Sequence, residues 1–316
     1  MHLQIAFAAD TSYVPHLGAA LVSLFENNQI FSRITVHLLS NDIAVSDLDK
    51  LNSLVKLHGR EMIIYDLNSS LQILQKTYSI PSTISISSYA RLFLSEFVGE
   101  EVTKIIYADC DSVFLGSLRD LWNTPFEGRL ILGVKDHVGT APRTAIRLSA
   151  KDLYINAGFL FIDLRKWRAI KADQIMINFI AAHNGKVNHH DQGVINGCFH
   201  HFIGALHPRY NVMTSFFDFK SVAHIRKFYQ VENFYSQAEI NEAVTDPVFV
   251  HYTPSFSKRP WIEGSKHPLQ NQYWEYVAKT PWAERKRQKD DRSYLVKTLE
   301  KLYWILGATL WKKIFV

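Results

Sequence analysis

The stretch from Lys104 to Leu118, KIIYADCDSVFLGSL, constrains the fold of this chain more than any other. Residues 105–107 form a short apolar run that predicts a buried strand, and we expect that strand to end at Asp109. Asp111 follows two residues later, so two carboxylates meet at the mouth of the strand, where they repel each other and lose hydration. A divalent ion shared with a phosphate-bearing ligand is the usual compensation. The alternative is an ordinary turn, and the pair alone does not decide between them.

The net charge of the chain is concentrated at its C-terminal end. The chain has 35 Lys and Arg against 30 Asp and Glu, a net charge of +5. Residues 282–316 contain nine of the basic residues and four of the acidic ones, so this segment carries the whole excess and the rest of the chain is neutral. A basic globular face is therefore absent, and nucleic acid is not an expected partner.

Other features favour a cytoplasmic protein. The two cysteines, Cys110 and Cys198, do not make a disulfide framework, which fits a reducing compartment. The start, MHLQIAFAAD, lacks the basic region and the long apolar run of a signal peptide. No stretch approaches the roughly 20 apolar residues that span a bilayer.

Strands and helices alternate in the first third of the chain. Apolar runs of strand length occupy residues 3–9, 33–39 and 62–65. Pro15 suits the first turn of a helix after the first strand, and a second helix is expected to start at an N-cap Ser46 and to end before Gly59. This alternation predicts parallel crossover units and an α/β fold of the nucleotide-binding type with a mostly parallel central sheet.

The elements expected further along the chain are less regular. Residues 137–150 have no clear periodicity and predict a mobile loop. The remaining expected elements are a helix with Arg91 near its start, a short helix ending at Gly128, strands at 130–134 and 247–251, a strand followed by a helix over 155–167, and a polar turn that opens a helix over 188–199.

Six motifs occur together in one order: FAADTSY, SSYARLFL, YADCDSVFLGSL, NAGFLFIDLRKW, HHDQGVIN and VHYTPSFSKRPW. Their order and spacing resemble glycosyltransferase family 8, and within it the bacterial enzymes that build lipopolysaccharide or lipooligosaccharide outer cores. The resemblance spans residues 3 to about 282. It implies a GT-A fold, a UDP-sugar donor, a Mn²⁺ or Mg²⁺ ion and transfer with retention of anomeric configuration.

The resemblance assigns three metal ligands. Asp109 and Asp111 match the D-x-D of the family, and His251 matches its third protein ligand. Two carboxylates and one imidazole suit Mn²⁺, which accepts both oxygen and nitrogen donors. Without the D-x-D, His251 would instead be read as a strand-end histidine bound to the backbone.

The resemblance also implies a nucleotide site after the first strand. Ala8 and Asp10 match positions at the uracil, and Tyr13 matches the residue that stacks on it. The alternative is an Asx-turn at Asp10 with Tyr13 packed in the core. Ser12 is placed at the ribose, although family members often carry Asn there, and Cys110 of the D-x-D joins the donor-binding set.

The sugar end of the donor is assigned in the same way. Arg91 matches a cation on the side of the sugar or diphosphate, the alternative being a structural ion pair. The small residues of a strand edge, which let the backbone approach the sugar, match at Asn156, Ala157 and Gly158. The polar set around the sugar hydroxyls and the anomeric centre matches at Asp136, Asp191 and Gln192, although Asp191 also suits a helix cap.

The chain departs from the family pattern after His251. Family members usually have a glycine and then Lys-Pro-Trp, whereas this chain reads TPSFSKRPW, with no glycine and an insertion. We expect Lys258 to contact the diphosphate, as a point charge that tolerates small shifts in loop length, with Arg259 as the alternative.

These assignments predict a retaining, metal-dependent enzyme that moves galactose or glucose from a UDP-sugar to a lipid-linked saccharide acceptor. Gln192 is a poor nucleophile, so a front-face route is favoured over double displacement. Two rivals remain: a phosphatase of the haloacid dehalogenase type, whose signature resembles IIYADCDSV, and a sugar-nucleotide-binding module of the same fold without catalysis.

The C-terminal segment predicts a membrane contact. Leu295, Leu299, Leu302 and Leu306 recur at helical spacing among lysines and aromatic residues. A basic, aromatic-rich amphipathic helix lies in a membrane interface, and an anionic surface attracts it. We therefore expect a catalytic domain over 1–282 and an interfacial segment over 283–316 that holds the enzyme on the inner face of the cytoplasmic membrane. The alternative is a helix packed on the domain or on a second copy.

Overall fold

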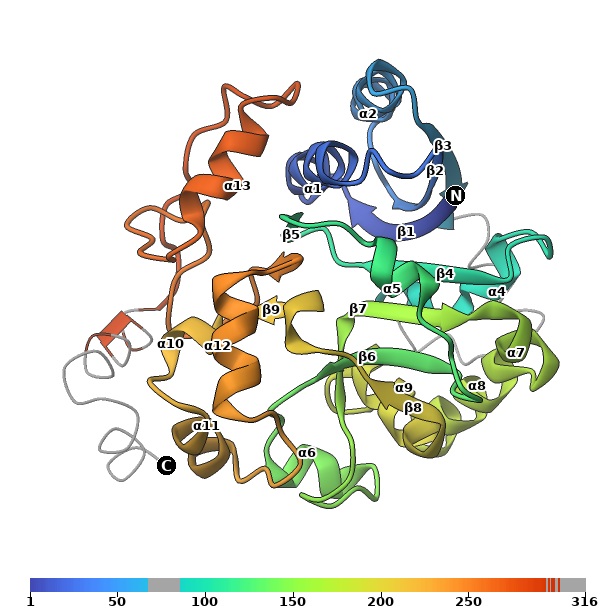
Figure 1. The fold of residues 1–316 in the computed structure, drawn as a ribbon, viewed down its shortest axis with the longest axis vertical. Helices are drawn as coiled ribbons and strands as arrows, with labels where there is room; N and C mark the ends of the chain where they lie inside the picture. Colours follow the sequence, from blue (N-terminus) through green and yellow to red (C-terminus); the bar gives the residue numbers. More distant parts are fainter. Residues whose placement is uncertain (68–85, 294, 296, 299–300, 302–316) are drawn as a thin grey trace.

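The computed structural model describes residues 1–67, 86–293, 295, 297, 298 and 301, and it confirms an α/β fold around one large sheet (Figure 1). The order of its seven strands is β3-β2-β1-β4-β7-β6-β8. The strands are β1 (His2–Asp10), β2 (Arg33–Asn41), β3 (Glu61–Asp66), β4 (Lys104–Ala108), β6 (Ile131–Lys135), β7 (Ile155–Asp163) and β8 (Ile203–Ala205).

The N-terminal part is the expected series of parallel crossovers. β1 pairs in parallel with β2 and with β4, and β2 pairs in parallel with β3. The connecting helices are α1 (Val14–Asn27) and α2 (Val45–Leu57). The prediction of Ser46 as an N-cap is wrong, because the N-cap of α2 is Ala44, two residues earlier, and it makes no side-chain cap. Gly59 follows the end of α2 with a φ of 63°, a conformation that glycine adopts without strain.

The strand β7 runs against its neighbours. It pairs antiparallel with both β4 and β6, and β6 pairs in parallel with β8. The start of β7 therefore lies at the edge of the sheet where β4 and β6 end. Asp109 donates its backbone N–H to the carbonyl of Gly158 over 2.8 Å, which joins that edge across the two strands.

Three expected elements differ from the structure. The segment that carries Arg91 is mostly a 3₁₀ helix, η1 (Ile86–Phe93), before the single turn α4 (Leu94–Phe97). The helix α5 (Arg119–Asn123) ends five residues before Gly128. The expected irregular loop contains α6 (Thr140–Ala145) and is held by Arg143, whose buried guanidinium donates to the carbonyls of residues 136, 138, 149 and 152.

The expected strand–helix pair after the loop and the helix after the polar turn are confirmed. They correspond to β7 with α7 (Leu164–Ala169) and to α9 (His190–Phe199), with α8 (Ala172–Ala182) between them. In Figure 1 these helices lie together beside β6 and β8.

A second, three-stranded sheet has the order β5-β10-β9. β5 pairs antiparallel with β10, so that Ser112 lies opposite His251, and β10 pairs in parallel with β9. The elements of this part are β5 (Ser112–Phe114), η3 (Pro208–Tyr210), β9 (Val212–Met213), α10 (Ser215–Asp218), α11 (Val222–Tyr229), α12 (Gln237–Thr245), β10 (Phe249–His251) and α13 (Gln270–Val277), whereas η2 (His200–Phe202) directly precedes β8 of the large sheet.

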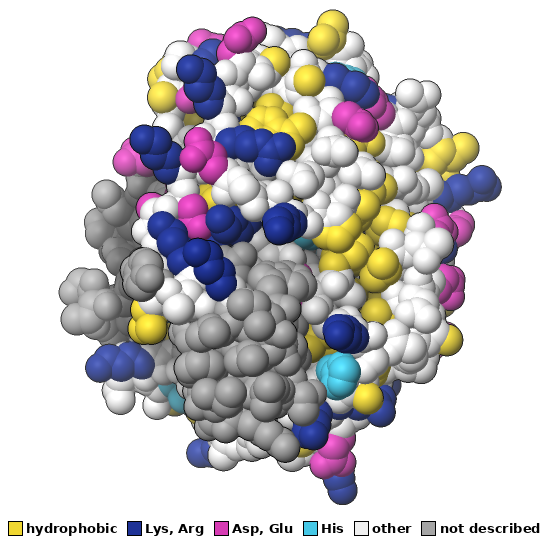
Figure 2. Space-filling view, turned by 90° about the vertical axis from the view of Figure 1, so that its left-hand side faces the viewer, with side chains coloured by type: hydrophobic (Ala, Val, Ile, Leu, Met, Phe, Trp, Pro, Cys, Tyr) yellow, Lys and Arg dark blue, Asp and Glu magenta, His cyan; other side chains and the backbone are white. Residues whose placement is uncertain are grey.

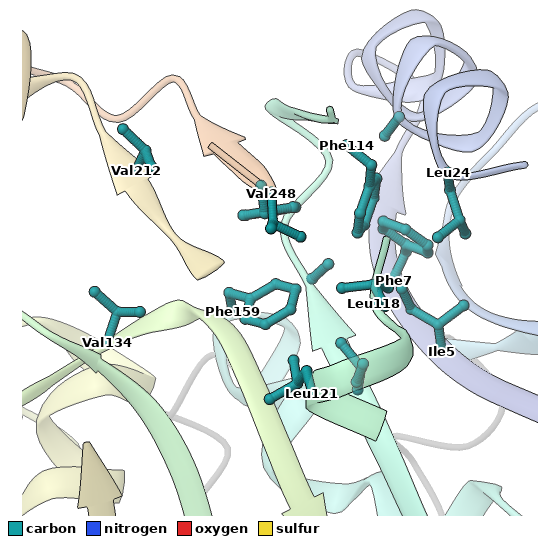
Figure 3. Close-up of a cluster of buried hydrophobic side chains, with 14 of the residues drawn as sticks. Ile5, Phe7, Leu24, Phe114, Leu118, Leu121, Val134, Phe159, Val212 and Val248 are labelled. Atoms are coloured by element: carbon teal, nitrogen blue, oxygen red, sulfur yellow. The ribbon is translucent and has the colours of Figure 1, made fainter. Parts of the chain in front are cut away.

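An aromatic core joins the two sheets (Figure 3). Phe114 of the small sheet contacts Phe7 of β1, with ring centroids 6.5 Å apart, and Phe249, at 4.9 Å. Phe159 of β7 lies 4.6 Å from Phe249. All four side chains are fully buried, so the edge where β1, β4 and β7 meet the small sheet has a rigid base.

The predicted interfacial helix falls largely outside the described residues. Within it, residues 295, 297, 298 and 301 are helical. In the part of the chain that the structure describes, every helix is too short or too polar to cross a bilayer.

Candidate active site

A cavity of about 430 Å³ opens at the edge of the large sheet where β1, β2 and β4 end. This is the edge at which open α/β sheets bind ligands. It is lined by Ala8, Ala9, Asp10, Tyr13, Asn41, Leu67, Arg91, Asp109, Cys110, Asp111, Asn156, His251, Thr253, Pro254 and Arg259.

Two aspartates and one histidine converge in this cavity. Ligand atoms of Asp109, Asp111 and His251 lie within 4.8 Å of one another, the one such group among the described residues. The aspartates flank the turn between β4 and β5, and the antiparallel pairing of β5 with β10 brings His251 beside them. His251 Nε2 lies 3.1 Å from Asp111 Oδ1 and 3.7 Å from Asp109 Oδ2.

Because Gly158 has no side chain, His251 and Asp109 can occupy the space beside its Cα. A Cβ at residue 158 would lie 2.1 Å from His251 Cε1 and 2.9 Å from Asp109 Oδ2, closer than atoms can approach. Because His251 is buried and held by β10, it cannot move aside without cost. The position therefore requires glycine for a close approach rather than for its backbone angle.

The charges of the group depend on one another. Burial alone would raise the pKa of the Asp111 carboxyl, but the charge and hydrogen bond of His251 and the charge of Arg259 lower it to about 2. Burial alone would lower the pKa of His251, and Asp111 and Asp109 raise it instead. The carboxylates thus favour a cation between them, and both His251 and Arg259 contact Asp111.

Arg91 lies between the aspartates of two different motifs. Its Nη1 is 2.8 Å from Asp109 Oδ1, and its Nε is 3.0 Å from Asp191 Oδ2 at the start of α9. Its guanidinium lies over the Tyr107 ring, 4.6 Å from the centroid. Burial raises the pKa of Asp191, and the charge of Arg91 partly offsets this rise. Arg91 lines the cavity and also forms ion pairs with two aspartates, so the structural alternative is confirmed, and its contact with the donor stays a prediction.

Two of the polar residues predicted at the sugar, Asp136 and Gln192, form a network with Asn156 behind the cavity wall. Asp136 Oδ2 accepts from Asn156 Nδ2 and Gln192 Nε2, each over 3.0 Å. Gln192 Oε1 in turn accepts from the Ala157 backbone over 3.0 Å and from Asn156 over 3.2 Å. Burial alone would raise the pKa of Asp136, but the charge of His137 and these hydrogen bonds lower it. The network fixes the strand edge at Asn156, its one member that lines the cavity.

The residues at the end of β1 form the Asx-turn, and two of them also line the cavity. Asp10 Oδ1 accepts from the backbone of Ser12 and of Tyr13, over 2.8 and 3.1 Å, and from the Ser12 hydroxyl over 2.6 Å, which is the Asx-turn that we gave as the alternative. Asp10 and Tyr13 nevertheless line the cavity, whereas Ser12 is exposed and does not. Cys110 contacts Ala8 through its thiol, 3.2 Å from the carbonyl oxygen, and burial raises its pKa, so it packs the base of the cavity as a neutral side chain.

Residues 253–265, which we call the donor loop, place Arg259 rather than Lys258 in the cavity. Arg259 Nη2 lies 3.0 Å from Asp111 Oδ2, and its other nitrogens donate to the Tyr252 carbonyl over 3.0 Å and to the Tyr13 hydroxyl over 3.3 Å. Lys258 points away from the cavity and pairs with Asp290 over 2.9 Å. The structure thus favours the alternative that we gave for this position.

The cavity has five further lining residues that the sequence did not single out: Ala9, Asn41, Leu67, Thr253 and Pro254. Asn41 lies opposite Asp10 in the register of β1 and β2, both strands ending one or two residues later than expected. The rule that parallel strands end at the same edge would have identified it, had the second strand been extended to its polar end. Thr253 and Pro254 lie in the inserted stretch, where no pattern was available.

Comparisons with known proteins agree on one family. The model of the family described as Glycosyl transferase family 8 matches residues 4–264. General stress protein A of Bacillus subtilis (strain 168) is 23% identical over 284 residues, covering 89% of this chain and 94% of that protein. Lipopolysaccharide 1,2-glucosyltransferase of Escherichia coli (strain K12) is 23% identical over 288 residues, covering 89% of this chain and 79% of that protein.

The solved structures agree on the fold. The structure of galactosyltransferase LgtC in complex with donor and acceptor sugar analogs is 22% identical, with a TM-score of 0.69 over 88% of this chain and 96% of that one. This likeness confirms the predicted GT-A fold.

Proposed function

Because this chain belongs to glycosyl transferase family 8, we propose that it is a retaining, metal-dependent enzyme that moves galactose or glucose from a UDP-sugar to a saccharide acceptor of the lipopolysaccharide or lipooligosaccharide core. The observation that carries the proposal is the convergence of Asp109, Asp111 and His251 within 4.8 Å, in a cavity at the strand ends where this fold binds nucleotides. A relative named lipopolysaccharide 1,2-glucosyltransferase supports the acceptor class.

The residues present fit a divalent ion. Asp109 and Asp111 offer hard oxygen ligands and His251 offers Nε2, a set that suits Mn²⁺ and, with more water, Mg²⁺. The absence of a side chain at Gly158 supports the same conclusion, since any Cβ there would displace His251. When bound, the ion neutralises the negative charge that builds on the diphosphate as it leaves.

The cavity residues support one orientation of the donor. Asp10 and Tyr13 provide an acceptor and a flat aromatic face for uracil at the end of β1. Arg259 holds Asp111 Oδ2, so that Asp111 Oδ1 faces His251, and its guanidinium is the cation best placed for the diphosphate. We therefore assign the diphosphate contact to Arg259 instead of Lys258.

The network behind the cavity supports the front-face route. The side-chain oxygen of Gln192 already accepts two hydrogen bonds, and Gln192 does not line the cavity. Asp191 is paired with Arg91, and Asp136 with Asn156 and Gln192. A nucleophile in any of these positions would have to break those contacts first, whereas in a front-face transfer the departing phosphate accepts the acceptor proton. We assign Asp136, Asp191 and Gln192 to orienting the sugar side of the site.

The acceptor is proposed to be lipid-linked, and the segment 283–316 to hold the enzyme at an anionic membrane on the cytoplasmic side. The support is the concentration of basic and aromatic residues in that segment. The catalytic domain would then comprise residues 1–282, with residues 285–292 packed against it.

The test is UDP release from UDP-galactose, UDP-glucose, UDP-GlcNAc and UDP-GalNAc with Mn²⁺, with and without a lipooligosaccharide acceptor. We expect one UDP-hexose to be turned over, loss of activity in EDTA and recovery with Mn²⁺. A non-catalytic module would bind UDP without turnover, and a phosphatase would release inorganic phosphate from a phosphomonoester in place of UDP. Either result, or full activity in EDTA, would overturn the proposal.

A further inference from the structure

Three consecutive residues of the donor loop bind three different aspartates. These contacts are Ser257 N to Asp218 Oδ2 at 2.9 Å, Lys258 Nζ to Asp290 Oδ2 at 2.9 Å and Arg259 Nη2 to Asp111 Oδ2 at 3.0 Å. The aspartates come from the end of α10, from residues 285–292, which we call the connector, and from the D-x-D. The loop that carries Arg259 is therefore held from the connector on one side and from the cavity on the other.

The connector also binds the backbone of the donor loop. Gln288 donates its N–H to the Trp261 carbonyl over 2.7 Å, and its own carbonyl accepts from Glu263 N over 2.8 Å. These bonds form a parallel bridge between Gln288 and Ile262. Arg287 Nη1 donates to the Pro260 carbonyl, the residue next to Arg259, over 3.2 Å. The connector is thus joined to the backbone of the loop by one isolated β-bridge and one side-chain hydrogen bond.

The beginning of the connector reaches the cavity wall through one histidine. Arg285 Nη1 lies 3.3 Å from Nε2 of the buried His16, whose ring centroid is 4.1 Å from that of Trp261 and 5.6 Å from that of Tyr13. The Tyr13 hydroxyl accepts from Arg259 over 3.3 Å. Through His16, the beginning of the connector is therefore linked to Tyr13 and Trp261, the two aromatic residues beside Arg259.

We propose that the connector is a positioning strap for Arg259, and that Asp290 is its key positioning residue. Asp290 draws Lys258 to the outside of the donor loop, which directs the neighbouring Arg259 into the cavity. None of the described residues that line the cavity belongs to the connector, so its effect on the donor is exerted through Arg259. The proposal rests on the proposed function, in which Arg259 binds the diphosphate of the donor.

The Lys258–Asp290 pair is more than an ordinary surface ion pair. The Asp290 side chain is only 11% exposed, and Arg292 binds the same carboxylate with Nε at 2.9 Å and Nη2 at 3.0 Å. Lys297 Nζ donates to the Asp290 carbonyl over 2.7 Å. On the face that carries α13, Lys and Arg side chains gather beside acidic ones (Figure 2). A partly buried carboxylate with several donors holds its geometry better than an exposed pair.

The test measures the dissociation constant of UDP with Mn²⁺ by calorimetry on the full chain. We expect Asp290→Asn to weaken UDP binding about fivefold, since coupled neighbours in one network contribute on the order of that factor. Asp291→Asn removes the same charge from the adjacent, exposed residue and should leave binding unchanged. In an Arg259→Met background, adding Asp290→Asn should cause no further loss, because the strap then has nothing to position.

The outcomes separate the strap from the proposed function. If the wild-type chain does not bind UDP with Mn²⁺, the proposed function fails and the strap fails with it. If the wild type binds and Asp290→Asn binds equally well or more tightly, the strap alone is wrong, and a tighter complex would mean that the released Lys258 contacts the diphosphate itself. Additive losses in the double variant would also overturn it. Should Asp290→Asn not fold, Lys258→Met in the Arg259→Met background makes the same test: no further loss supports the strap, and a further loss overturns it.

Discussion

The two walls of the cavity are held together by different forces. The strand-end wall, with residues 8–10, 41 and 109–111, continues from β1, β2 and β4 and inherits its shape from backbone hydrogen bonds between parallel strands. The donor loop has few such bonds and depends on side-chain contacts with Asp111, Asp218 and Asp290. A substitution in the strand-end wall should therefore change the reactivity of the site while the cavity keeps its shape. A substitution in the donor loop should change the shape of the cavity, and the change of shape should in turn alter the reactivity.

Asp111 belongs to both walls, and its replacement should have the largest effect. Asp111→Asn removes a proposed metal ligand and also the carboxylate that holds Arg259. Loss of the ion's charge stabilisation is worth several kcal/mol, so UDP-sugar turnover with saturating Mn²⁺ should fall on the order of 1000-fold. Asp120→Asn, an exposed residue of α5, is the matched control. Turnover within tenfold of wild type would remove Asp111 from the machinery.

Gly158→Ala isolates the strand-end wall, because it keeps every ligand. The added Cβ would displace His251 and Asp109, and overpacking of this kind costs about 1–3 kcal/mol. Mn²⁺ affinity, measured by electron paramagnetic resonance, should fall about tenfold to hundredfold. Gly139→Ala, where the nearest atom is 3.7 Å away, should bind Mn²⁺ as the wild type does. Equal Mn²⁺ affinity for the two variants would mean that the backbone of β7 shifts to accommodate the added Cβ, in spite of its pairing with β4 and β6.

A pair of neighbouring substitutions isolates the donor loop. Arg259→Met removes three donors from the cavity, and we expect UDP to bind about thirtyfold more weakly, since hydrogen bonds to charged groups contribute about 1.5–3 kcal/mol. Lys258→Met removes an equal charge outside the cavity and should weaken binding less, by about fivefold. Calorimetry with UDP and Mn²⁺ gives both values. A larger loss of UDP affinity in Lys258→Met than in Arg259→Met would indicate that Lys258 is the diphosphate contact after all.

Acidification should lower the free energy of unfolding through buried histidines near both walls, and this is the smallest of the expected effects. Burial lowers the pKa of His37, in β2, to about 4, that of His267, after the donor loop, to about 4 and that of His16, beneath the loop, to about 3. The unfolded chain then binds more protons than the folded one between pH 6.5 and about 4, so stability falls as the pH falls through this window. Each histidine should account for about 1 kcal/mol at pH 5.5.

Thermal melts of single variants at pH 7 and pH 5.5 measure how much stability each buried histidine costs on acidification. His37→Gln should lose less stability on acidification than the wild type, while His201→Gln, at an exposed site, should match the wild type. His251, with its raised pKa, contributes with the opposite sign in all of these proteins, so the difference between variants is the informative quantity. An unchanged pH dependence in His37→Gln would contradict the assignment.

The strand-end wall could be predicted because its information is local. An apolar run identifies each strand, polar residues at its end identify the edge, and parallel pairing brings Asp10 and Asp109 to the same edge. Gly158 also followed from the order of the motifs, although its reason, the space needed by His251, is visible only in three dimensions.

The donor loop could not be predicted in this way. Whether Lys258 or Arg259 enters the cavity is decided by Asp290, some thirty residues later in a stretch that reads as a charged linker. The helix within 137–150 was not predicted for a similar reason: Arg143 holds it through the carbonyls of residues before and after it. The first contact joins two side chains far apart in the sequence and the second joins a side chain to nearby carbonyls, and neither leaves a periodic trace in the sequence.

The pairing of β5 with β10 has a consequence for the order in which the chain assembles. His251 contacts Asp111 across 140 residues, so during synthesis both carboxylates emerge long before their imidazole partner. Under the proposed function, a nascent chain that ends before β10 has two repelling acids and no third ligand, and it would hold a divalent ion weakly. Because only the completed chain would then bind the ion well, a rising ion concentration would stabilise finished molecules over incomplete ones.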